Sequence, residues 1–189
     1  TEADIASMAL RLGRTSAIVG ISAQDTLAYA TALSSLGIEA EAGGSAVSRT
    51  WTKLQNAASQ GGESLEAFAS ISGMTADEFK QEWDSDPGSA FNAFIKGLSE
   101  SKDIIADLAK VGINDIREGD AMKALANGYD IMTSALERSN TAWSENTALQ
   151  NEADKMAETT AGQIQITKNN LVEAARGIGE TMLPTIKDV

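Results

Sequence analysis

Carboxylates are the only reactive side chains that this sequence offers in number. Seven acids and one base, Lys80, lie in the stretch from Glu63 to Asp86. Two of the acids, Glu78 and Glu82, stand four residues apart, which places both on one face of a helix and could resemble a glycosidase acid pair. Acids near a helix start also cap free amide groups and favour the positive end of the helix dipole. This structural explanation is the stronger one, and a carboxylate-pair glycosidase is kept as a minor hypothesis.

The other motifs that could bind a ligand are incomplete. The run from Asp84 to Gly88 begins like a calcium loop, but Ser89 and Ile95 stand where an EF-hand needs glycine and glutamate. The run 177–179 lacks the third glycine of a dinucleotide fingerprint, and 61–64 lacks the lysine of a phosphate loop. We therefore expect no catalytic residue, no cofactor and no metal site.

Composition excludes further classes of function. The 189 residues contain no His and no Cys, so thiolate nucleophiles, disulfides, thiolate zinc sites and histidine bases are absent. Fifteen Lys and Arg against 27 Asp and Glu give a net charge of −12. That charge repels a phosphate backbone, so we expect no direct nucleic-acid binding. No apolar run approaches the ~18 residues that span a bilayer, so we expect no membrane span in this sequence.

Glycines that are followed at once by an apolar residue punctuate the chain. A glycine in the left-handed conformation just past a helix, with an apolar side chain folding back after it, is typical of a helix C-terminus. We interpret Gly37, Gly73, Gly112 and Gly128 as structural helix stops of this kind, with a similar pair at Gly20. An Ala-rich sequence with two prolines agrees with an all-α fold. The predicted helices are 2–12, 23–36, 46–58, 64–72, 76–84, 87–99, 102–111 and 115–127.

The sequence changes character after residue 128. From 129 to 178 it has only two glycines, Gly162 and Gly177, and no proline, which predicts one or two much longer, coiled-coil-like helices. We therefore expect a compact array of short helices over 1–128 and a long helical hairpin or rod-like extension over 129–189. The alternative for the second part is an amphipathic helix lying against the compact domain. The residues predicted to form the seam between helices are Leu149, Met156, Ile164, Leu171 and Ile178.

Ten segments of the chain carry a family pattern, and they are 20–26, 32–38, 41–46, 60–69, 73–79, 142–149, 152–155, 159–160, 168–170 and 179–184. In this order, they resemble the helical core of bacteriophage tail tape measure proteins. The resemblance covers nearly all 189 residues, which makes it more specific than any single motif in the chain.

The resemblance implies a structural virion protein and no enzyme. Tape measure proteins lie in the lumen of the tail tube, set tail length during assembly, and are expelled before DNA ejection. The implied partners are the tail tube protein, tail assembly chaperones and baseplate or tail-tip proteins, with self-association of the long helices in the full protein. The implied location is the virion tail, and the bacterial host cytoplasm during assembly. Because the chain is short and begins at Thr1, we expect it to be a fragment of a longer protein.

A second class of function would have the same composition. A helical protein–protein adaptor or coiled-coil module of non-phage origin also needs an acidic, helical sequence without catalytic residues. The genes beside the parent gene distinguish the two, since neighbours encoding tail tube and baseplate proteins favour the phage interpretation.

Overall fold

The computed structural model describes residues 1–145 and 167–177, and its regular secondary structure is all helical, as predicted. A helix at 167–177 follows the labelled helices. The labelled helices are α1 (Glu2–Val19), α2 (Ala23–Ser35), α3 (Ala40–Gln60), α4 (Gly62–Ile71), α5 (Ala76–Ser85), α6 (Pro87–Ser99), α7 (Ile104–Lys110), α8 (Ile116–Asn127) and α9 (Tyr129–Glu145).

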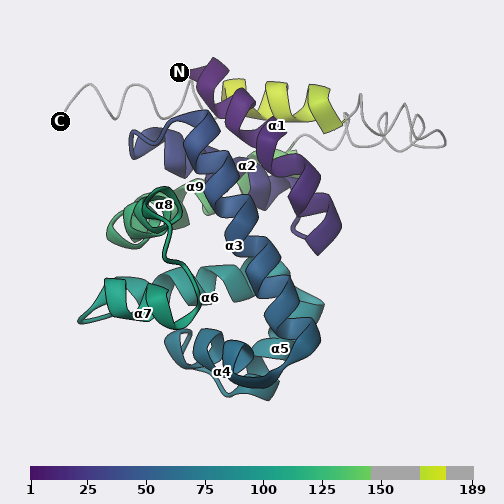
Figure 1. Ribbon diagram of the computed structural model, residues 1–189. Coiled ribbons are helices and arrows are strands. Elements are labelled where there is room, and N and C mark those ends of the chain that lie inside the picture. Colours follow the sequence, from purple (N-terminus) through teal and green to yellow (C-terminus); the bar gives the residue numbers. More distant parts are fainter. Residues whose placement is uncertain (146–166, 178–189) are drawn as a thin grey trace.

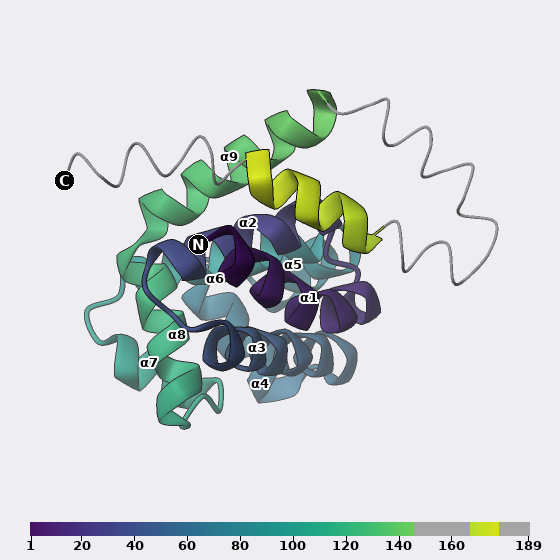
Figure 2. The same ribbon diagram turned by 90° about the horizontal axis from the view of Figure 1, so that it is seen from above.

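The long helix α3 organises the molecule. It packs against α1 near one end and against α4 and α5 near the other, while α8 lies along its side (Figure 1). Helix α2 lies between α1 and α9 and contacts both. Seen from above, the same arrangement places α7 and α8 at one edge of the molecule and α1 away from them (Figure 2).

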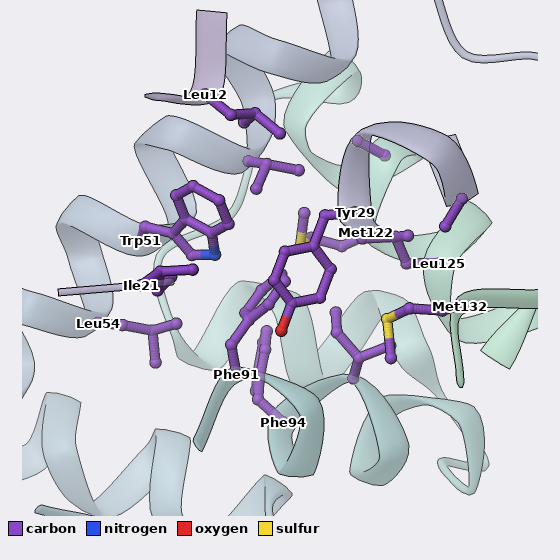
Figure 3. Close-up of a cluster of buried hydrophobic side chains, with 14 of the residues drawn as sticks. Leu12, Ile21, Tyr29, Trp51, Leu54, Phe91, Phe94, Met122, Leu125 and Met132 are labelled. Atoms are coloured by element: carbon purple, nitrogen blue, oxygen red, sulfur yellow. The ribbon is translucent and has the colours of Figure 1, made fainter. Parts of the chain in front are cut away.

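Three aromatic side chains from three helices meet in the core (Figure 3). Tyr29 of α2, Trp51 of α3 and Phe91 of α6 have ring centroids 5.1 to 5.8 Å apart and pack edge to face. All three are fully buried. Such pairs contribute about 0.5 to 1.5 kcal/mol each beyond the burial of their area. The triangle therefore fixes how α2, α3 and α6 sit together.

Four of the glycine stops have the predicted geometry. Gly20, Gly37, Gly73 and Gly112 have φ between 71° and 84°, the left-handed region that glycine tolerates best. In each case the amide after the glycine donates to the carbonyl five residues earlier, at 2.9 to 3.0 Å. This is the Schellman bond, and it returns the chain toward the core.

Gly128 differs from the prediction. Its φ is −102°, and α9 begins at the next residue, so the break between α8 and α9 needs no left-handed residue. A glycine is needed at this position for a different purpose, because a Cβ there would overlap the side chain of Leu36. Gly128 therefore allows the end of α8 to approach the end of α2, which a local pattern does not reveal.

Two helices are longer than predicted because glycines lie inside them. Helix α1 continues through Gly13 to Val19, and α3 begins at Ala40, before Gly43 and Gly44. A Cβ on Gly43 would lie 3.0 Å from the Met8 sulfur, and one on Gly44 would lie 2.9 Å from the Arg11 Cβ. These two glycines therefore let α3 cross α1 closely, and the predicted start of this helix at residue 46 was wrong.

The expected change of architecture after residue 128 is not seen in the described residues. Helix α9 has 17 residues and packs along α2, so the compact body continues past 128. Met132 and Ala135 are fully buried, and the Ser139 hydroxyl donates to the Gln24 carbonyl at 2.8 Å. The helix at 167–177 lies beside α1 in both views (Figures 1 and 2). Long coiled-coil helices are thus not part of the described structure.

The predicted seam is only partly within the described residues. Leu171 is 2% exposed and belongs to the hydrophobic core, together with Ala175 one turn later. This arrangement fits the alternative of an amphipathic helix that lies against the compact domain. The remaining predicted seam residues, Leu149, Met156, Ile164 and Ile178, lie outside the described residues.

Candidate functional site

The carboxylate pair singled out in the sequence serves the start and the side of α5. Glu78 accepts hydrogen bonds from the Thr75 amide and hydroxyl, each at 2.8 Å, and so closes a capping box. These bonds, the amide first, lower the pKa of Glu78 below its ordinary value. A glycosidase general acid needs a raised pKa. The cap interaction therefore argues against Glu78 as the acid of a pair with Glu82.

A polar cleft of about 500 Å³ lies where the first turns of α2 and α6 approach α9. Apart from Pro87 and Leu136, the side chains that line it are carboxylates, amides and hydroxyls. Its polar lining includes Ser22, Gln24, Asp25, Asp86, Asn92 and Asn140.

One carboxylate in this cleft, Asp25, has a shifted pKa. Burial raises the pKa of Asp25, a hydrogen bond with Ser22 opposes the rise, and the charge of Asp86 adds to it. A Cβ on Gly88 would lie 2.6 Å from Asp25 Oδ2, so the glycine lets this carboxylate sit against α6. Burial, with smaller contributions from both acids, also raises the pKa of Tyr29.

The same groups already have structural partners. Asp86 caps α6 by accepting from the Ser89 amide at 3.0 Å, and Ser22 caps α2 by accepting from the Asp25 amide at 3.0 Å. The Tyr29 hydroxyl lies 2.8 Å from Asn92 Oδ1. The cleft is therefore explained by helix starts, and its charge excludes anionic ligands.

A buried ion pair joins α3 to α8. Glu118 is 2% exposed, and its carboxylate accepts from Thr50 Oγ1 at 3.0 Å and from Lys53 Nζ at 2.9 Å. Lys53 also donates to the Gly112 carbonyl at 2.8 Å, at the end of α7. Asp115 caps α8 and lies 3.6 Å from Arg49 of α3. The sequence does not predict this cluster, because the residues that pair in it stand 59 to 68 positions apart and have no local pattern.

An apolar surface lies between α7 and α8, and we call it the α7–α8 face. Its two outer isoleucines, Ile105 and Ile116, are 71% and 78% exposed. Between the helices is a hollow of about 210 Å³. The apolar residues and the glycine that line it are Ile105, Leu108, Ala109, Ile113, Ile116 and Gly119. The sequence does not indicate this surface, since isoleucines on short helices are ordinarily core residues.

The residues predicted from the sequence do not gather at one place. Gly37, Gly73 and Gly112 end three different helices, and Gly128 separates two others. Within residues 1–145 and 167–177, no group of three or more carboxylates could hold a metal ion. In the same part of the chain, no helix is both long and apolar enough to cross a membrane.

We compared the chain with known proteins and found no relative. No family model, no curated protein and no solved structure matches the chain.

Proposed function

We propose that this chain is a segment of a phage tail tape measure protein, which acts through packing and assembly. The proposal depends on the resemblance of ordered segments over nearly the whole sequence. In the virion tail it would lie within the tube lumen, after assembly in the host cytoplasm. Its partners would be the tail tube protein, tail assembly chaperones and baseplate or tail-tip proteins.

One observation carries the proposal beyond the resemblance itself. The resembling segments of the first half coincide with helix junctions and close helix crossings. Residues 20–26 and 32–38 form the two ends of α2, and 41–46 contain the glycines where α3 crosses α1. Segments 60–69 and 73–79 form the starts of α4 and α5. A protein that acts through its shape would share with its relatives the residues that determine the path of the chain.

The ruler role would belong to helical rods of the parent protein, and the compact body would be a folded part beside them. An α-helix rises about 1.5 Å per residue, so chain length converts directly into tube length. This would require no catalytic residue and no cofactor. The net charge of −12 would reduce adhesion to DNA that passes through the same lumen.

The test is tail length in phage that carry in-frame deletions. Removing roughly 40 residues from a helical rod of the parent protein should shorten the tail by about 60 Å. Replacing the same residues by an unrelated helical sequence of equal length is the matched control and should leave the tail unchanged. Tails of unaltered length after the deletion would refute the ruler role for that region.

The alternative, a helical adaptor of non-phage origin, has one observation in its favour. The α7–α8 face exposes two isoleucines beside a hollow, as an adaptor that binds a protein partner would. An adaptor would be found outside virions. Detection of the parent protein in purified tails would therefore favour the tape measure, and its absence from them would favour the adaptor.

A further inference from the structure

The α7–α8 face contains a hollow that no side chain of the described residues fills. Its hollow, at about 210 Å³, is smaller than the roughly 300 Å³ at which small-molecule sites begin. Its lining is mainly aliphatic, which suits the side chains of a protein better than a polar metabolite. We infer that the α7–α8 face binds a second copy of this chain, and this inference does not depend on the proposed function.

Gly119 in α8 is the first reason to expect an occupant. A glycine inside a helix weakens it relative to alanine, so it usually has a packing reason. Gly97 has one, because a Cβ there would overlap the carbonyl of Ile71. At Gly119 a Cβ would meet only Leu108 Cδ1, at an ordinary 3.9 Å. Gly119 is itself buried at the floor of the hollow, so the absent side chain leaves the hollow open and is not required for packing within this chain.

Charge favours a second copy as the occupant. Helix α7 carries one acid and one base, Asp107 and Lys110, whose charged groups lie 2.7 Å apart. Helix α8 carries two of each sign, with Asp120 and Lys123 joined at 2.6 Å. Both helices are therefore neutral, whereas the whole chain carries −12. Two copies repel each other least when they meet through neutral helices.

The geometry allows a symmetric contact. Protruding isoleucines and the hollow lie on the same face, so a two-fold axis lets each copy place an isoleucine in the hollow of the other. Helices α7 and α8 lie at one edge of the molecule, where a partner can approach (Figures 1 and 2). A stable interface buries at least ~1,200 Å², and only the two short helices α7 and α8 take part here, so we expect a weak, concentration-dependent dimer.

Sedimentation equilibrium of the full 189-residue chain, from about 10 µM to about 1 mM, tests this inference. We expect a monomer–dimer equilibrium that strengthens with added salt, because salt screens the repulsion between two acidic bodies. Ile116→Ser should weaken the dimer by at least about tenfold. Ile18→Ser is the matched control, since Ile18 is 76% exposed on α1, away from this face, and should leave the dimer unchanged.

A second variant fills the hollow without touching the isoleucines. Gly119→Leu should abolish dimerisation, while Gly13→Leu, at a helical glycine that also has open space, should not. Unchanged circular dichroism of the variants would show that the fold is retained. Monomers over the whole concentration range would overturn the inference and leave the face to another partner. A dimer that survives Gly119→Leu or that Ile18→Ser disrupts would overturn it as well.

Discussion

Replacing Lys53 by methionine tests how strongly the buried Glu118 depends on its lysine partner. The change removes two hydrogen bonds of the ammonium group, to Glu118 Oε2 at 2.9 Å and to the Gly112 carbonyl at 2.8 Å. Methionine keeps most of the apolar stem, so the packing of α3 against α8 is largely retained. The Glu118 carboxylate would keep the Thr50 hydroxyl as a donor but would lose its opposite charge.

The expected loss of stability follows from the burial of the two partners. Breaking a fully buried ion pair costs about 3 to 5 kcal/mol, and breaking an exposed one costs about 0 to 1 kcal/mol. Glu118 is 2% exposed and Lys53 is 33% exposed, so water can replace part of the lost interaction. We therefore expect Lys53→Met to lower the free energy of unfolding by about 2 kcal/mol.

A double-mutant cycle in urea separates the ion pair from its surroundings. Glu118→Gln keeps the shape but removes the charge, and we expect it to cost about 1 kcal/mol. In that background Lys53→Met should cost about 1 kcal/mol less than in the unaltered protein, because no buried charge remains unpaired. Lys80→Met, which removes an exposed pair with Asp84, is the control and should cost under about 0.5 kcal/mol. If the losses of unfolding free energy of the two single variants sum to that of the double variant within about 0.5 kcal/mol, the reasoning is refuted.

Two further changes test the helix glycines and the polar cleft. Gly97→Ala should destabilise the protein by about 3 kcal/mol, because its Cβ would overlap the Ile71 carbonyl. Gly13→Ala should stabilise the protein by about 0.5 to 1 kcal/mol, because a Cβ there meets nothing and alanine favours a helix. Urea unfolding measures both changes. Because the folded pKa of Asp25 is raised by burial and by Asp86, its charge opposes folding at pH 7. Asp25→Asn should therefore stabilise at pH 7, and its advantage should decline as the pH falls through the folded pKa of Asp25; an advantage independent of pH would contradict this.

The parts of the fold that the sequence predicts are those with local causes. At Gly37, Gly73 and Gly112, the glycine and the apolar residue after it form the whole motif, so neighbours in sequence are enough. The start of α5 is similar, because Thr75 and Glu78 cap it within one turn. Most helix bounds between residues 62 and 127 were accordingly close to those observed.

The features that the sequence does not predict have causes far away in the chain. A Cβ on Gly44 would overlap Arg11, and one on Gly128 would overlap Leu36. The partner of Glu118 is Lys53, 65 residues earlier. A helix packed closely against another can use the same residue type that ends a helix elsewhere. No local pattern distinguishes these two uses, so contacts of this kind become visible only in the folded chain.

Gly97 and Gly119 show what this distinction adds to the search for a function. Both lie inside helices, and both look like weak points in the sequence. The first gives its space to the Ile71 carbonyl of the same chain, and the second gives it to a hollow on the surface. A glycine of the first kind explains the fold, whereas a glycine of the second kind, beside exposed isoleucines, indicates a partner. The inferred binding of a second copy can therefore be tested with a single added side chain. Gly119→Leu should prevent this binding and leave the fold unchanged.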